Sequence, residues 1–156
     1  MRTTSETLQV VVFALAGNEF GIDIVQVREI DRLMPITRVP RVPAHVEGIV
    51  NLRGQLVPIV DLRTRLGIPH TEPTKTARII VAEIGPRSIG MIVDEVREVV
   101  RIPVDQIADS EGVLEGLANE FIGALGKVDE RLIILLDVER VLGPEAPADL
   151  TDKGST

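Results

Sequence analysis

The 156-residue chain contains no cysteine, no tryptophan and no tyrosine, and it has only three phenylalanines. The absence of cysteine excludes a disulfide framework and a zinc site with thiolate ligands, and it favours a reducing compartment. So few aromatic rings leave no stacking platform for single-stranded nucleic acid, and a net charge of −7 opposes binding to a phosphate backbone. Composition therefore argues against a nucleic-acid-binding protein.

Long apolar runs and a leader-like N-terminus are also missing. No apolar stretch approaches the roughly 18 residues of a membrane-spanning helix. Residues 1–9 lack the positively charged and then apolar layout of a secretory signal. We therefore expect a cytoplasmic protein without membrane insertion. Residues 1–7 and 144–156 are polar, which predicts a disordered N-terminus and a mobile tail.

Branched aliphatic residues dominate the remaining composition. The 21 valines and 17 isoleucines favour strands over helices, because β-branched side chains suit a pleated surface. The length of the chain allows one ordinary domain or two very small ones. The expected fold class is all-β.

Residues 46–62, VEGIVNLRGQLVPIVDL, are expected to form a β-hairpin around which the fold is organised. Arg53 and the glycine after it form the two-residue turn, since glycine adopts a positive φ without strain. This turn places Val50 opposite Val57. Both faces of the hairpin carry apolar residues, which predicts that both are covered. Pro58 cannot donate to a ladder and is expected at an edge or a bulge.

The chain contains an internal repeat. Residues 9–30, QVVVFALAGNEFGIDIVQVREI, recur in type 69 positions later as RIIVAEIGPRSIGMIVDEVREV. At a shift of 75 Gly48 aligns with Gly123, and one extra residue in the second turn then aligns Asp61 with Asp137. Each of these aspartates is followed by a short helical pattern and then a glycine (Gly67 and Gly143), which predicts an N-cap and a C′ glycine.

The repeat predicts two copies of a five-stranded unit, at residues 8–70 and 77–143, joined by a polar linker at 71–76. Units this small have little core of their own, so the two are expected to pack on each other. Gly90, between two apolar strands, is expected at a bulge or bend of a curled sheet.

No catalytic constellation emerges from the sequence. Asp61 and Asp137 occur once per half, like the carboxylates of aspartic proteases, but the residues that follow them lead into helical turns and favour capping. His45 and His70 stand alone, with no cysteine and no histidine-rich spacing, which favours structural or solvated histidines over metal ligands. Residues 17–21 lack the Lys-Ser/Thr of a phosphate-binding loop. We expect no enzyme activity, no cofactor and no metal.

Three features indicate a binding function. Arg53, at the hairpin tip, is either a solvated turn residue or a contact to a partner. Val27 with Ile30, like Val96 with Val99 in the repeat, forms either core packing or an exposed apolar pair. Two small units also carry more apolar surface than their cores need, which indicates a patch for a partner.

Four segments strongly resemble the CheW family of bacterial chemotaxis coupling proteins: VEGIVNLRGQLVPIVDLRTRLG, FGIDIVQVREI, IGMIVDEVREVVRIPVDQI and LGKVDERLIILLDVERVL. The resemblance covers roughly residues 8–143. It implies two SH3-like five-stranded β-barrels packed around a shared core, with short capping helices. It also implies a non-enzymatic adaptor that couples chemoreceptors to a CheA-type histidine kinase in a signalling array.

The resemblance also implies two binding sites. The cytoplasmic tip of a chemoreceptor is placed in the groove between the barrels, where Val27, Val93 and Val99 are expected to stay partly exposed and Arg53 to keep its guanidinium free. The matching receptor-binding positions are Ile24, Val27, Glu29, Ile30, Arg53, Val93 and Val99. The regulatory domain of the kinase is placed at the outer ends of the barrels, and the matching loop, 108–120, supplies Ala108, Val113 and Leu114. This loop has no aromatic or basic residue, the side chains that usually anchor an interface.

Two alternatives stay open. The same fold could serve a related array that controls pili or another output. A small-molecule sensor domain, the less favoured alternative, would need a pocket with converging polar groups.

Overall fold

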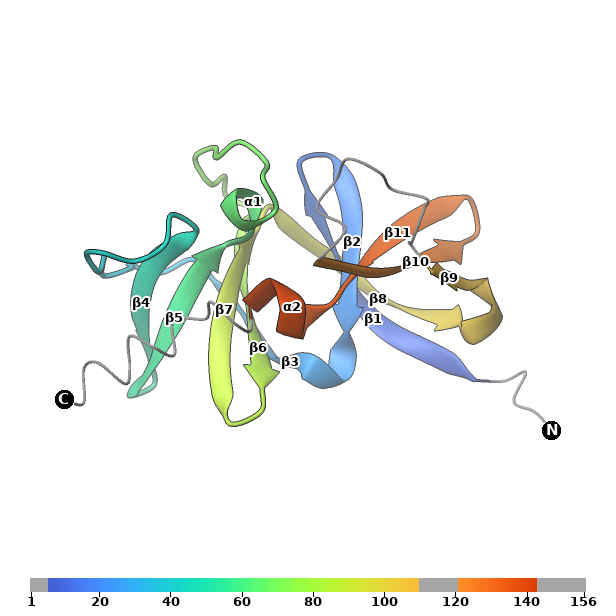
Figure 1. Ribbon diagram of the computed structural model, residues 1–156, viewed down its shortest axis with the longest axis horizontal. Coiled ribbons are helices and arrows are strands. Elements are labelled where there is room, and N and C mark those ends of the chain that lie inside the picture. Colours follow the sequence, from blue (N-terminus) through green and yellow to red (C-terminus); the bar gives the residue numbers. More distant parts are fainter. Residues whose placement is uncertain (1–5, 110–120, 143–156) are drawn as a thin grey trace.

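The computed structural model describes residues 6–109 and 121–142, and in these ranges it is built mainly of β-strands. Two curled sheets lie next to each other along the long axis of the molecule (Figure 1). The six-stranded sheet has the order β8 (Glu95–Pro103), β1 (Thr7–Leu15), β2 (Asn18–Asp23), β11 (Arg131–Leu136), β10 (Ile122–Val128), β9 (Ile107–Asp109). The five-stranded sheet has the order β3 (Val27–Arg32), β6 (Arg78–Ile84), β7 (Arg87–Val93), β5 (Gln55–Asp61), β4 (Val46–Leu52). The prediction of an all-β fold is confirmed.

The two sheets do not divide the chain where the sequence predicts. The five-stranded sheet is formed by residues 27–93, and the six-stranded sheet by residues 7–23 together with residues 95–136. The predicted linker at 71–76 therefore connects two elements of the same sheet. The chain changes sheets instead at the 3-10 helix η1 (Ile24–Gln26) and at Asp94. Periodicity identifies strands, but it carries no information about which distant strand each one joins.

The internal repeat is confirmed by the strand registers. In the six-stranded sheet Val11 pairs with Val99, and in the five-stranded sheet Ile80 pairs with Ile30. These two pairs are related by the shift of 69. Because the first two strands of each copy join the remaining strands of the other copy, each sheet contains parts of both halves.

The alignment of the two later hairpins needs a correction. Leu52 pairs with Gln55, and Val128 pairs with Arg131, so both hairpins have two-residue turns and the shift is 76 throughout. The equivalent of Gly48 is then Ala124 and not Gly123. No extra residue lies in the second turn.

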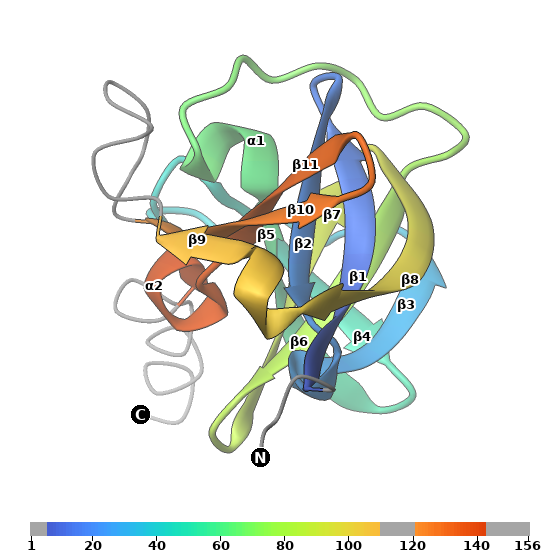
Figure 2. The ribbon, with the colours of Figure 1, turned by 90° about the vertical axis from the view of Figure 1, so that its right-hand side faces the viewer.

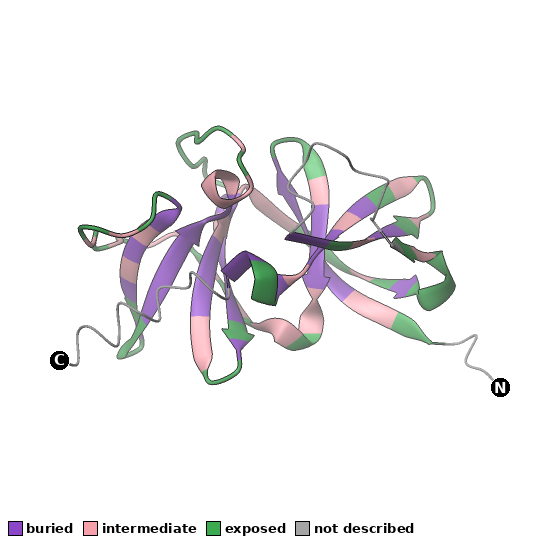
Figure 3. Ribbon diagram, in the orientation of Figure 1, coloured by how far each residue is buried: buried purple, intermediate pink, exposed green. Residues whose placement is uncertain are grey.

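Three apolar cores hold the strands together, and Figure 3 shows buried positions along the strands of both sheets. The shared core between the sheets draws on β1 and β2 from one sheet and on β5, β6 and β7 from the other. Each sheet also encloses a smaller core of its own. Along β1, Val10 and Val12 face the six-stranded core, whereas Val11 and Phe13 face the shared core. This double coverage explains why the strand is apolar at every position from Val10 to Leu15.

The 46–62 hairpin pairs as predicted and is covered on both faces only along part of its length. Val50 lies opposite Val57, and Arg53 has a φ of 53° at the turn. β5 is buried on both faces from Val57 to Asp61, whereas β4 buries alternate residues only and Leu56 remains 66% exposed. Pro58 lies in β5, an inner strand, one residue before the ladder to β7 begins. The expectation of an edge or bulge for Pro58 is therefore wrong.

Both predicted helix caps form. Asp61 accepts a hydrogen bond from the backbone N–H of Arg63 and caps α1 (Leu62–Arg65), which ends before Gly67 with a φ of 80°. Asp137 accepts one from the backbone N–H of Arg140 at the start of α2 (Val138–Leu142). Gly143, the predicted C′ residue of α2, lies outside the described residues.

Close backbone packing, and not a bulge, accounts for Gly90. Its register with β6 is unbroken, but a Cβ atom at this position would lie 2.6 Å from Cδ1 of Ile59. A Cβ on its equivalent, Gly21, would lie 3.1 Å from Cγ2 of Ile133. The glycines let β2 and β7 lie against the side chains of the neighbouring strand.

Candidate functional site

The predicted receptor-binding residues concentrate on the outer strands β3 and β8. These strands are equivalent in the repeat and form one edge of each sheet. Ile30 on β3 is 40% exposed and Val99 on β8 is 48% exposed. Figure 2 shows both strands on the same side of the molecule, at the right of that view. The two apolar side chains thus occupy corresponding places on the two sheets.

The other apolar residues of the predicted set are more deeply placed. Ile24 and Val27 are half-buried and pack against the shared core. Val93 is fully buried in that core, so the expectation that it stays partly exposed is wrong. It lies at the end of β7, an inner strand, whereas Val99 lies on an edge strand. Strand position, and not residue type, separates these two valines.

Arg53 is exposed, but its guanidinium is not free. Nη2 of Arg53 donates to both carboxylate oxygens of Glu29 on β3. A hydrogen bond from Asp31 and then the Arg53 guanidinium lower the pKa of Glu29, and the same contact with Glu29 raises the pKa of Asp31. Arg53 comes from the β4–β5 turn at the opposite edge of the sheet, so the ion pair joins the two edges.

Two further contacts support this closure of the five-stranded sheet. Nη1 of Arg28 donates to Oε1 of Gln55 at 2.6 Å and to Oγ of Ser88 at 3.0 Å. Thr37 forms an isolated bridge with Ile49 on β4. The sheet is therefore curled so that its hairpin tip lies against β3. The charged pair lies on the face of β3 that carries Glu29, and Ile30, the next residue, points to the opposite face.

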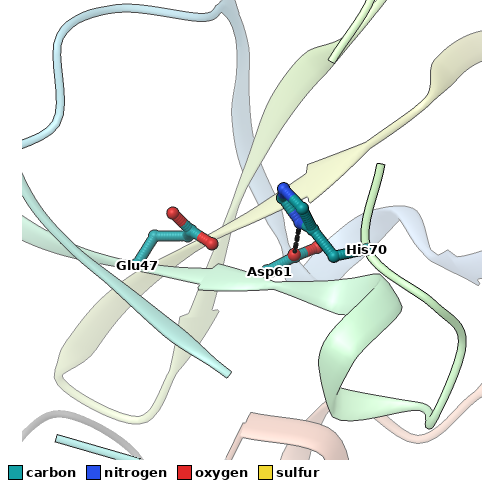
Figure 4. A group of neighbouring side chains, drawn as sticks. All are labelled: Glu47, Asp61 and His70. Carbon is teal, nitrogen blue, oxygen red and sulfur yellow. Dashed lines mark hydrogen bonds and ion pairs between the residues drawn. The ribbon is translucent and has the colours of Figure 1, made fainter. Parts of the chain in front are cut away.

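A cavity of about 200 Å³ lies elsewhere in the five-stranded unit, next to α1. Its walls include Glu47, Asp61 and His70, whose side chains converge (Figure 4). Nδ1 of His70 lies 2.8 Å from Oδ2 of Asp61, and this hydrogen bond raises the pKa of His70. Across the cavity, Arg63 forms a bidentate pair with Asp94, at 2.8 and 3.1 Å. The cavity thus combines polar groups of both charges with an apolar floor.

Known proteins resemble this chain over most of its length. The family model described as CheW-like domain matches residues 9–145. The chain belongs to the CheW family. Curated CheW relatives include the chemotaxis protein of Klebsiella aerogenes, which is 36% identical over 88% of this chain and 82% of its own length. The chemotaxis protein CheW of Bacillus subtilis is 33% identical over 88% of each chain.

A solved structure and a further relative extend the comparison. The crystal structure of the scaffolding protein TtCheW from Thermoanaerobacter tengcongensis superposes with a TM-score of 0.84 at 34% identity, covering 90% of this chain and 97% of that one. Protein PilI of Pseudomonas aeruginosa is 34% identical over 70% of this chain and 62% of its own length. Among the described residues of this CheW-family chain, no helix is long and apolar enough to cross a membrane.

The residues matched to the kinase-binding loop of the CheW family are only partly placed. Ala108 is exposed on β9, the other edge of the six-stranded sheet. Val113 and Leu114 lie outside the described residues. Of the three predicted kinase-binding residues, the structure therefore describes only Ala108, which has a small side chain.

The sequence analysis missed two features of this CheW-family fold. Leu56 and Leu132, related by the shift of 76, are 66% and 58% exposed just after the turns of the two equivalent hairpins. A corrected repeat alignment would have paired these leucines. The grouping of Glu47 with Asp61 and His70 was also missed, because the three residues come from different elements and no cysteine or second histidine lies near His70 in sequence.

Proposed function

We propose that this chain is a non-enzymatic adaptor that couples chemoreceptor signalling domains to a CheA-type histidine kinase. Family membership and relatives described as chemotaxis and scaffolding proteins support this proposal. The observation that carries it is the pair of equivalent edge strands, which lie on the same side of the molecule and each of which carries an exposed branched residue. The adaptor works in the cytoplasm and reaches the membrane only through its receptors.

The receptor tip is proposed to bind along β3 and β8. An apolar helical segment laid against these strands would bury Ile30 and Val99, each worth roughly 1–2 kcal/mol. Arg53, which is 64% exposed and bound to Glu29 on the other face of β3, would supply a polar contact where the partner reaches around the edge of that strand. Of the predicted receptor-binding residues, Val93 is buried in the shared core and therefore makes no direct contact with the receptor in this proposal. The direct contacts proposed are Ile24, Val27, Glu29, Ile30, Arg53 and Val99.

The test of the receptor surface uses Ile30→Asp and Val99→Asp. Both side chains are exposed, so each variant is expected to keep its melting temperature within a few degrees of the parent and to lose most of its affinity for a purified receptor signalling fragment. Leu132→Asp is the matched control, because it changes an apolar residue on another strand that is somewhat more exposed than Ile30 or Val99. Parental affinity in both edge-strand variants would place the receptor elsewhere.

The kinase regulatory domain is proposed to bind at the outer end that carries Ala108, with Val113 and Leu114 from the following loop. Because Ala108 is small, we expect its substitution alone to change kinase binding little. The test is a triple variant that truncates all three side chains, with Ala108→Gly, Val113→Ala and Leu114→Ala. Its binding to the isolated regulatory domain is measured, which tests this proposal separately from the receptor surface.

A pilus-controlling array is the second candidate output, and the similarity to protein PilI favours it specifically. The two outputs share the same adaptor geometry. Pull-down with the kinases of flagellar and pilus arrays from the source organism distinguishes them, because the adaptor should retain the kinase of its own array.

A further inference from the structure

The cavity beside α1 contains a group of potential metal ligands. Glu47, Asp61 and His70 come from β4, the end of β5 and the segment after α1, and one ligand atom from each lies within 4.8 Å of the others. Figure 4 shows the three side chains facing one another. We propose that Glu47, Asp61 and His70 bind a divalent metal ion of the zinc type.

The ligand set fits that class of ion. Zinc binds imidazole nitrogen and carboxylate oxygen at about 2.0–2.2 Å, which separates neighbouring ligand atoms by about 3.4 Å in a tetrahedral site. The His70–Asp61 contact at 2.8 Å would open slightly and the wider separations would contract. His70 is half-exposed and can make this adjustment. One imidazole with two carboxylates favours zinc over magnesium or calcium, which prefer oxygen ligands alone.

Electrostatics in the cavity also favour a cation. Asp61 is only 4% exposed, and the Glu47 side chain is largely buried beside it. The Arg63 guanidinium in the same cavity is engaged with Asp94, and Arg38 is 83% exposed and 3.8 Å from Glu47. Two carboxylates therefore share a partly enclosed space in which a metal ion would offset their repulsion.

The internal repeat separates metal binding from helix capping. Asp61 and Asp137 are equivalent, and both cap a short helix. Glu47 is the extra residue of a β-bulge, which turns its side chain toward the cavity, whereas the equivalent bulge residue in the other copy is Gly123. Capping therefore requires the aspartate in both copies, but a second carboxylate is present in only one.

The experiment titrates the full chain, stripped with a chelator, with ZnCl₂ in competition with a chromogenic zinc indicator. We expect one equivalent of zinc to bind. Asp61→Asn should weaken binding at least about tenfold while keeping the cap, because asparagine caps helices as well as aspartate does. Asp137→Asn is the matched control and should bind zinc like the parent. Melting temperatures without zinc confirm that both variants fold.

Two further measurements identify the ligands. Glu47→Gln and His70→Ala should each weaken zinc binding at least about tenfold. With Co²⁺ in place of zinc, the visible ligand-field spectrum of the parent should change in His70→Ala. The proposal is overturned by absence of stoichiometric binding, by parental affinity in Asp61→Asn, or by equal losses in Asp61→Asn and Asp137→Asn. Displacement of zinc by an equal concentration of Mg²⁺ would overturn the assignment of metal class.

Discussion

Arg53 combines an exposed position with a contact inside the fold. Arg53 is predicted as a free cation at a hairpin tip, yet its guanidinium binds Glu29 across the opening of the five-stranded sheet. The contact does not remove Arg53 from a partner's reach, since its side chain stays 64% exposed. It does mean that substitution of Arg53 affects a neighbour as well as a partner.

Arg53→Glu is expected to weaken receptor binding by about thirtyfold, because it reverses a charge at the rim of the proposed interface. It also places two carboxylates together, so a small loss of thermal stability should accompany it. The double variant Arg53→Glu with Glu29→Arg restores the ion pair. Recovery of stability without recovery of receptor affinity, measured by calorimetry and by binding, would show a direct contact. Recovery of both would show that the pair acts only by closing the sheet.

Glu19 predicts a pH dependence of stability. Its carboxylate accepts two hydrogen bonds from Arg131, both at 3.0 Å, and these bonds lower the pKa of Glu19 in the folded protein. A lowered folded-state pKa stabilises the fold above the unfolded pKa, and this contribution is lost as the pH falls through the folded value. Glu19→Gln should therefore unfold more easily than the parent at neutral pH, by up to about 1 kcal/mol, and the difference should shrink in acid. Denaturant titrations at several pH values measure it; a constant difference would contradict the assignment.

At the scale of elements, the sequence predicts most strands, the Arg53 turn and both caps because these depend on local chemistry. It does not predict how strands are shared between sheets, because that depends on contacts between distant residues. The alignment of Gly48 shows what the sequence alone cannot decide. Gly48 and Gly123 occur in similar hairpins and match by residue type, but the strand registers make Ala124 the equivalent of Gly48.

This difference between the two glycines is testable. Gly48 has a φ of 151°, and a Cβ atom there would lie 2.1 Å from the carbonyl oxygen of Thr37. Gly48→Ala should therefore cost more than about 2 kcal/mol of the free energy of unfolding. Gly123→Ala places its Cβ 3.8 Å from the nearest atom and should cost less than about 1 kcal/mol. Equal costs in denaturant titrations would mean that Thr37 does not approach β4 as closely as described.

On the scale of the whole molecule, the shared core makes the two sheets one cooperative unit. Phe13 on β1 is fully buried in this core and stacks on Phe20, with ring centroids 5.8 Å apart. Phe13→Ala should lower the free energy of unfolding by about 3–5 kcal/mol. Because both sheets line the shared core, unfolding should remain a single transition, with amides of β4 and β10 losing hydrogen-exchange protection together. Earlier loss in one sheet would show separable units.

The proposed receptor surface could be predicted only in part, because the sequence does not show which strands lie at the edges of the sheets. Residue types in the motifs identify Ile30 and Val99 as candidates, and the structure exposes both. The same motifs include Val93, which is buried, because exposure depends on whether a strand lies at an edge. The metal-ligand group was not predictable, since Glu47 reaches Asp61 and His70 only through a bulge and a curled sheet.

The path of the chain through the two sheets has a consequence during synthesis. The hairpin of β1 and β2 is made before the other described strands. Its neighbour β8 is made only after the whole five-stranded sheet, and its neighbour β11 is the last described strand. Residues 27–93 can complete their own sheet in the interval. At roughly 5–20 residues per second, the first hairpin waits for several seconds with both apolar faces and both edges uncovered. We therefore expect a chaperone that protects the nascent chain to bind Thr7–Asp23.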